Sequence, residues 1–183
     1  MVQSPRHAIE KIVALCTTHL HNVVDVQIYE YTSCYLWHDR PLYNHFGEQI
    51  KQLTGDTIYL YENSSSPATD LFHELGHMVG RRLNLIGHAE NSYHGHWETN
   101  NTRLIAEVSG QNHWSEYLNE FASAQDGFAA NSASELWAEL FMLWHLYPHS
   151  PEARLLDSTM IQAQANTDCQ LIAKLAGQLQ IAT

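Results

Sequence analysis

Residues 66–80 read SPATDLFHELGHMVG and contain the strongest structural signal in the chain. Ser66 and Pro67 are residue types preferred at the N-cap and at the first position of a helix. Apolar residues then recur at helical spacing as far as Leu83. The stretch therefore predicts a helix that begins at Pro67 and ends near Leu83.

Within this helix, the run His73-Glu74-Leu75-Gly76-His77 has the HExxH pattern of zinc sites. Because residues four apart are neighbours on a helix, the imidazoles of His73 and His77 can bind one Zn²⁺ ion. Glu74 follows the first histidine and is then placed to act as general base toward a metal-activated water. The alternative is a helix whose two histidines only cover a core.

A catalytic zinc ion that keeps one position open for water needs a third protein ligand. The candidate lies in SASELWAELF, residues 132–141, where Glu135 and Glu139 fall on one face of a strongly apolar helix. An acidic group in such surroundings usually has a partner. Glu135 is the predicted ligand, with Glu139 either accepting the N–H of a ligand imidazole or taking the ligand position itself. A second interpretation makes Ser132 and Glu135 a capping box at a helix start.

The whole chain predicts a mostly helical α+β protein with a small sheet. Helices are expected at residues 4–20, 103–108, 114–121 and 132–146, and in one or two pieces over about 152–180. Strands are expected at 23–31 and 57–61, and a histidine-rich loop at 87–101. The strand that precedes the HExxH helix is expected at the edge of the sheet, where an extended peptide can add to it. Gly76 and Gly80 weaken a helix, which indicates a close neighbour on that face.

The length of 183 residues predicts one domain, which the HExxH motif makes a zinc metallopeptidase domain over residues 1–183. Its expected parts are an N-terminal helix and small sheet (1–65), the metal-binding helix (66–83), a loop and helices (84–131), and a helical C-terminal part that carries the third ligand (132–183).

The composition restricts the partners. There are 9 Lys+Arg and 20 Asp+Glu residues, and the resulting formal charge of -11 disfavours nucleic acid and anionic membranes. No apolar run approaches the roughly 20 residues of a membrane span. The 13 histidines point to metal binding or proton transfer. A monomer that acts on a peptide or protein, with neither nucleic acid nor a membrane span, is expected.

The cysteines and the N-terminal residues indicate where in the cell the protein is expected to work. The 3 cysteines are widely spaced and form no C-x-x-C motif, which predicts buried or incidental thiols. The N-terminal residues MVQSPRHAIEKIVALC lack the apolar segment and cleavage site of a Sec signal peptide. We expect either a cytoplasmic location or export by a non-Sec route.

Four stretches together resemble a known protease family: IYLY (58–61), HELGH (73–77), SELWAELF (134–141) and Glu152-Ala153-Arg154. They are similar to the protease domain of anthrax lethal factor and its small relatives, the secreted Pro-Pro endopeptidases. The similarity covers about residues 56–80 and 127–154. It implies a zinc peptidase of the gluzincin type with His73, His77 and Glu135 as zinc ligands. It also implies Glu74 as general base and Glu139 as the residue that supports a ligand.

Phe128 is a departure from that family. The resemblance implies an oxyanion-stabilising Tyr at this position, and Phe cannot donate a hydrogen bond. The candidate replacement donors are Tyr117, His113 and the loop histidines His88, His94 and His96. His94 and His96 also raise the question of a second metal site, although adjacent surface histidines are more often incidental.

The sequence therefore predicts a zinc-dependent endopeptidase that hydrolyses peptide bonds through a metal-activated water. The alternative is a weakly active or inactive zinc-binding relative that serves as a scaffold or interaction domain. Phe128 is the residue that favours this alternative.

Overall fold

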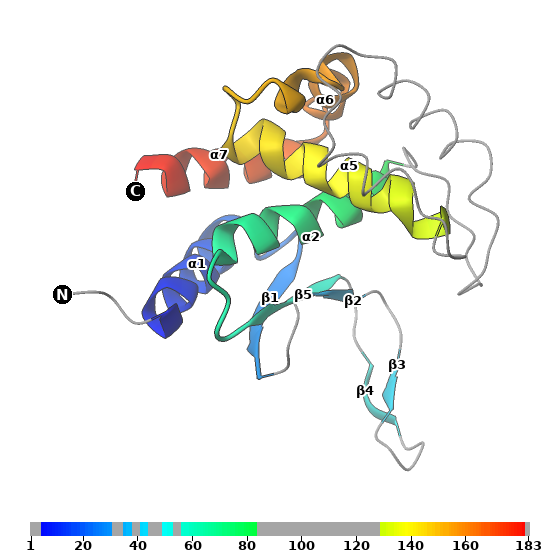
Figure 1. Ribbon diagram of the computed structural model, residues 1–183. Coiled ribbons are helices and arrows are strands. Elements are labelled where there is room, and N and C mark those ends of the chain that lie inside the picture. The colour runs from blue at the N-terminus through cyan, green and yellow to red at the C-terminus, as the bar shows by residue number, and fades with distance from the viewer. Residues whose placement is uncertain are drawn as a thin grey trace.

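The computed structural model describes residues 5–30, 35–37, 41–43, 49–52, 56–83 and 129–181. In chain order, the elements are α1 (Pro5–His19), β1 (Asp25–Tyr29), β2 (Tyr35–Trp37), β3 (Pro41–Tyr43), β4 (Gln49–Gln52), β5 (Thr57–Tyr61), α2 (Pro67–Arg82), α5 (Ala129–Leu146), the 3₁₀ helix η1 (Glu152–Arg154), α6 (Asp157–Ala163) and α7 (Thr167–Ile181) (Figure 1). The predicted loop at 87–101 and the predicted helices at 103–108 and 114–121 lie outside these residues. The predicted fold class, a mostly helical α+β protein with a small sheet, is confirmed.

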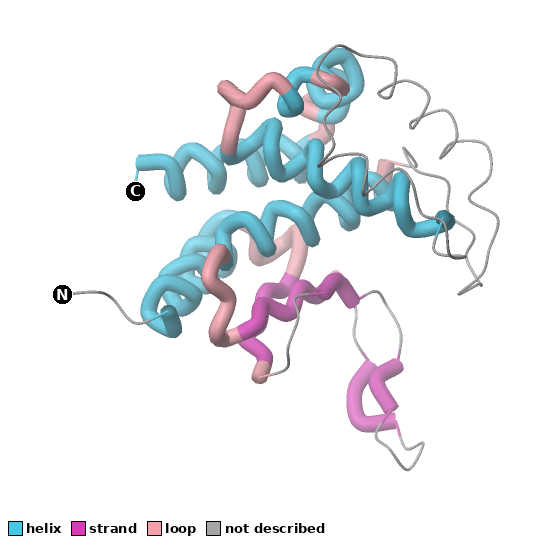
Figure 2. Tube along the Cα trace, viewed as in Figure 1, coloured by secondary structure: helices cyan, strands magenta, loops and turns pink. Residues whose placement is uncertain are grey.

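Helix α2 lies between the sheet and a second layer of helices (Figure 2). It packs against β5 and β2 on one side and against α5 on the other. Helix α1 packs beside α2 and against β1, and α7 contacts both α1 and α5. Contacts on opposite sides therefore hold α2 in position.

Strand β5 occupies the centre of the three-stranded sheet. It pairs in parallel with β1, with Asp25 opposite Thr57, and antiparallel with β2 on its other side. The expectation that residues 57–61 form an exposed edge is therefore wrong, although an edge strand, β2, does precede α2 in the chain. Residues 57–60 are buried without alternation, as expected of a strand that has neighbours on both sides and helices on a face. Strands β3 and β4 form a separate antiparallel pair.

A hydrophobic core joins the helices to the sheet. Its members recur at helical spacing along α1, α2 and α5 and also come from β1 and β5. Among the most deeply buried are Ile9, Leu20, Ile58, Leu60, Leu71, Phe72, Leu75, Met78, Trp137 and Phe141. The predicted core face of α5 is confirmed for Trp137 and Phe141, whereas Trp144 is half-buried.

Hydroxyl and carboxyl groups hold the start of α2. The Ser66 carbonyl accepts the first helical hydrogen bond from the Asp70 N–H at 3.0 Å. The Ser64 hydroxyl donates to the Asp70 carboxylate and accepts the backbone N–H of Ser66 at 3.0 Å. The carboxylate also lies in the first turn, where the helix dipole favours negative charge. The predicted helix start at Ser66 and Pro67 is confirmed.

Arg82 ties the last turn of α2 to three other parts of the protein. Its guanidinium donates to Asp56 before β5 at 2.9 Å and to the Val23 carbonyl at 2.7 Å. It also donates to Asp168, in the first turn of α7, at 2.8 Å. The Asp56 side chain is only 3% exposed, so this pair is largely withdrawn from solvent. Both ends of α2 are thus anchored.

Two of the three cysteines can be placed. Cys16 and Cys169 are buried free thiols, as predicted, and burial raises their pKa to about 12 and about 11. Cys34 lies outside the described residues. No helix in the part of the chain that the structure describes has both the length and the apolarity to cross a bilayer.

Candidate metal centre

Helices α2 and α5 run antiparallel and bring His73, His77 and Glu135 together. Nε2 of His73 lies 2.9 Å from Oε2 of Glu135, and Nε2 of His77 lies 3.3 Å from Oε1 of Glu135. The two histidine Nε2 atoms are 3.2 Å apart. The group can hold a metal ion, because its ligating atoms all lie within 4.8 Å of one another. Since Glu135 is 62 positions from His73 in the chain, only tertiary packing creates this group.

The distances between the nitrogen and oxygen atoms of this group suit a tetrahedral zinc ion. With zinc–ligand bonds of about 2.0–2.1 Å, tetrahedral ligand atoms lie about 3.3 Å from one another. The distance of 3.2 Å between the two histidine nitrogens is close to that value. Each of these nitrogens also lies near one oxygen of Glu135, His73 at 2.9 Å from Oε2 and His77 at 3.3 Å from Oε1. Two imidazole nitrogens and one carboxylate are also the donor set of catalytic zinc sites that keep a position open. The donor atoms present therefore fit zinc.

Glu135 is directed at the histidines and not at a helix start. Helix α5 begins at Ala129, so Ser132 lies inside the helix and the predicted capping box is wrong. The Glu135 side chain is 42% exposed, against 20% for His73 and 18% for His77. Solvent therefore reaches the metal group from the Glu135 side.

Glu139 contacts the other ring nitrogen of His73. Its Oε2 atom lies 3.3 Å from Nδ1 of His73, and its side chain is 7% exposed. A carboxylate that accepts the Nδ1–H fixes the tautomer in which the Nε2 lone pair is available to a metal. This is the geometry of a residue that supports a ligand imidazole.

Glu74 lies beside the metal group and is 8% exposed. Burial raises the pKa of its carboxyl, and the charge of Glu135 acts in the same direction, while His77 and His73 oppose the shift. These charges act on Glu74 because it sits next to the group on α2. A buried carboxyl adjacent to metal ligands is suitably placed for proton transfer.

The pKa values of His73 and Glu135 shift in opposite directions. Burial lowers the pKa of His73, but hydrogen bonds with Glu135 and Glu139 outweigh it and raise that pKa to about 10. Burial raises the pKa of Glu135, but hydrogen bonds with His73 and His77 outweigh it and hold that pKa well below its usual range. The two shifts share a cause, because the positive imidazolium of His73 and the negative carboxylate of Glu135 stabilise each other through their hydrogen bond at 2.9 Å.

The close neighbour that the glycines predicted is present at Gly76. A Cβ atom there would lie 2.7 Å from the Cα of Ala138 and 3.1 Å from the Cβ of Phe141. Real Cβ atoms do not approach other atoms so closely, so any side chain at this position would push α5 away from α2. For Gly80, the close neighbour stays a prediction.

Several predicted site residues lie outside the described residues, namely Phe128, Tyr117, His113, His88, His94 and His96. Their roles stay predictions.

Trp137 has a contact that its sequence pattern did not reveal. Its spacing indicated only a core residue, yet its indole N–H donates to the Gly76 carbonyl at 2.7 Å. The signal that could have revealed this contact is the N–H itself, since a buried indole usually needs an acceptor.

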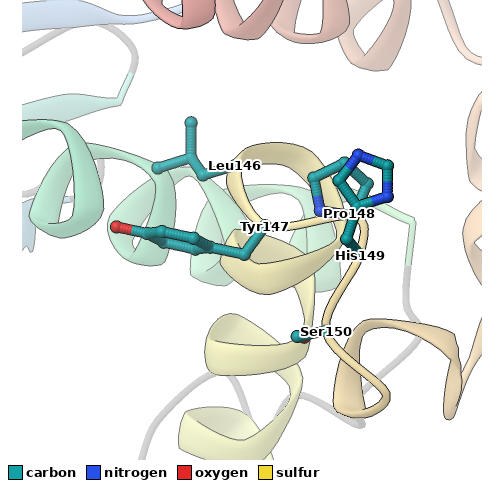
Figure 3. A pocket seen from close by; sticks show the side chains of 5 residues that line it. All are labelled: Leu146, Tyr147, Pro148, His149 and Ser150. Atoms are coloured by element: carbon teal, nitrogen blue, oxygen red, sulfur yellow. The ribbon is translucent and has the colours of Figure 1, made fainter. Parts of the chain in front are cut away.

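A pocket opens at the C-terminal end of α5 (Figure 3). It is lined by Leu146, Tyr147, Pro148, His149 and Ser150, about 16 Å along the helix from Glu135. The hydroxyl groups of Tyr147 and Thr69 lie 3.5 Å apart beside it. None of its described lining residues belongs to the metal group, so the pocket is separate from the candidate site.

Comparisons with known protein families, with curated proteins and with solved structures find no match for this chain. The resemblance to the lethal factor protease domain consequently rests on the sequence motifs around His73 and Glu135. The geometry of the metal group, together with those motifs, carries the functional conclusion.

Proposed function

We propose that this protein is a zinc-dependent endopeptidase in which His73, His77 and Glu135 hold the metal. The observation that carries the proposal is the placement of two imidazole nitrogens 3.2 Å apart, each 2.9–3.3 Å from a carboxylate oxygen of Glu135. A buried carboxyl, Glu74, lies next to them. Metal ligands with an adjacent proton acceptor are the parts that metal-assisted hydrolysis requires.

Each residue has a distinct task in this proposal. A zinc ion supplies Lewis acidity, which polarises the scissile carbonyl and makes a water molecule acidic near neutral pH. Glu74 accepts the proton of the attacking water and passes it to the departing amine nitrogen. Glu139 accepts the Nδ1–H of His73, so that the opposite ring nitrogen stays directed at the metal.

The motifs favour a peptide as the substrate. Glu135, Trp137 and Glu139 occupy the positions that the resemblance to lethal factor and the Pro-Pro endopeptidases rests on, and those families cleave peptide bonds. The exposed side of Glu135 provides an approach to the metal group. A substrate cannot pair with β5, however, because both edges of that strand are occupied.

Digestion of a diverse peptide library, with products identified by mass spectrometry, tests the proposal. Zinc-loaded protein is compared with protein that has been treated with a chelator and with the same protein after zinc is restored. We expect internal cleavage that disappears on chelation and returns with zinc. A protein that binds one zinc ion but yields no product would support the alternative, an inactive zinc-binding relative.

A further inference from the structure

The residues of the metal group form part of the contact between α2 and α5. Gly76 lies between His73 and His77 on α2, and Trp137 lies between Glu135 and Glu139 on α5. The indole N–H of Trp137 donates to the Gly76 carbonyl at 2.7 Å in a buried contact.

This hydrogen bond crosses between the helices at the level of the metal group. A backbone carbonyl has two lone pairs, so the Gly76 oxygen can accept a bond from its own helix and another from Trp137. The Trp137 side chain is 0% exposed and surrounded by close-packed neighbours, which prevent the ring from turning to another acceptor. The bond therefore restrains both sliding and rotation of α5 against α2.

The steric contact at Gly76 restrains the distance between the helices. A Cβ atom at Gly76 would lie 2.7 Å from the Cα and 3.0 Å from the carbonyl oxygen of Ala138. Both are backbone atoms, so no smaller side chain at Ala138 could relieve the contact. The backbone of α2 at Gly76 and the backbone of α5 at Ala138 are thus in close contact. This contact sets the distance between the two helices at the level of the metal group.

We infer that Gly76 and Trp137 are positioning residues that set the distance and direction of Glu135 relative to His73 and His77. The inference rests on the zinc site of the proposed function and does not depend on peptidase activity. Zinc–ligand distances vary by only about 0.2 Å between sites. A small displacement of α5 would therefore weaken the carboxylate bond and change the coordination geometry.

Two pairs of variants isolate this role. Trp137→Phe and Trp144→Phe each remove one indole N–H from α5, but the N–H of Trp144 donates to Asp157 at 3.2 Å, outside the metal group. Gly76→Ala and Gly177→Ala each add one methyl group inside a helix. At Gly177 the added methyl would meet nothing within 4 Å.

Zinc affinity is measured by competition with a chromophoric chelator. The visible absorption spectrum of the Co²⁺-loaded protein gives a second readout, because its intensity depends on coordination geometry. We expect Trp137→Phe and Gly76→Ala to lose about 10–100-fold in zinc affinity, as residues that support metal ligands do. Their Co²⁺ spectra should also change, whereas Trp144→Phe and Gly177→Ala should match the wild type. A loss of stability alone would leave the Co²⁺ spectrum of the folded protein unaltered.

The outcomes separate this inference from the proposed function. Wild-type zinc affinity and Co²⁺ spectra in folded Trp137→Phe and Gly76→Ala would overturn the inference and leave the zinc site intact. A wild-type protein that binds no zinc would overturn the proposed function, and the inference with it.

If Trp137→Phe does not fold, benzothienylalanine at position 137 replaces the N–H with sulfur and keeps the ring shape. The same analogue at position 144 is then the control, and the same criteria apply.

Discussion

Both ring nitrogens of His73 face carboxyl groups of α5, with Nε2 2.9 Å from Glu135 and Nδ1 3.3 Å from Glu139. The two glutamates are four positions apart and therefore lie on the same side of the helix. The ring is consequently held in one orientation by two carboxylate acceptors, and loss of the proton on Nε2 leaves the other proton on Nδ1, facing Glu139.

Removal of the carboxyl group in Glu139→Ala should lower zinc affinity by about 10–100-fold, because the imidazole of His73 loses the acceptor that orients it. Glu139→Gln keeps an oxygen acceptor at the same position and should lose less. Competition with a chelator measures both variants. Equal affinity in Glu139→Ala and the wild type would show that Glu139 does not support the ligand.

The His77→Ala variant should bind about one equivalent of zinc less than the wild type, because the loss of one of three ligands removes much of the affinity. Metal analysis of the purified proteins checks this. His149→Ala is the control, since His149 is an exposed histidine in the turn that follows α5, away from the metal group. The site assignment fails if His77→Ala keeps the zinc content of the wild type.

Substitution Glu74→Gln should leave zinc content unchanged and reduce hydrolysis by about 10²–10⁴-fold, because the amide has the size of the carboxyl group but cannot accept the proton. Initial rates on a peptide identified in the library experiment measure the loss. Glu10→Gln changes a 52% exposed glutamate on α1 and should cleave normally. Wild-type rates for Glu74→Gln would exclude Glu74 as the general base.

Loss of the guanidinium in Arg82→Met should destabilise the protein by about 3 kcal/mol, because it removes the cation from the buried Asp56 carboxylate. The control is Arg154→Met. Arg154 pairs with Asp157 at 3.4 Å with both side chains largely exposed, and such pairs contribute less than about 1 kcal/mol. Urea unfolding compares the two variants, and equal losses would contradict a special role for Arg82.

Acid should destabilise the protein through His145, which packs against the rings of Phe72, Phe141 and Trp144. Burial lowers the pKa of His145 in the folded protein from 6.5 to about 4. The unfolded chain therefore binds a proton at higher pH than the folded chain, so stability is lost as pH falls from 6.5 toward about 4. The loss amounts to about 3 kcal/mol and levels off at lower pH.

The change His145→Leu should flatten the fall in unfolding free energy over this pH range, as urea titrations at several pH values can measure. His149→Leu removes an exposed histidine nearby and should keep the slope of the wild type. An unchanged slope in His145→Leu would assign the acid sensitivity to other groups.

Local sequence patterns predicted the elements that carry the site. The Ser66-Pro67 start placed α2 correctly, and the residues of β5 were predicted with their observed bounds. The partnership of Glu135 with His73 followed from the chemistry of zinc, which needs a third ligand, and from an acidic residue on an apolar helix. Residue type and helical spacing were sufficient for these inferences.

Features that depend on distant contacts were not predictable in the same way. The order of strands in the sheet depends on tertiary packing, and so β5 was wrongly placed at an edge. Strands β2, β3 and β4 are too short, at three or four residues, to show a period. The contacts of Arg82 with Asp56 and Asp168 join segments far apart in the chain, and no local pattern marks them.

The metal group is formed by residues of two helices, with Glu135 62 positions after His73 in the chain. Ion binding and folding are therefore linked equilibria. In an unfolded chain, Glu135 has no fixed position relative to the histidines, so the proposed zinc site exists only in the folded state. A ligand that binds only the folded state adds about 2.7 kcal/mol of stability at 100 times its dissociation constant. The melting temperature of this protein is then a function of the free zinc concentration around it.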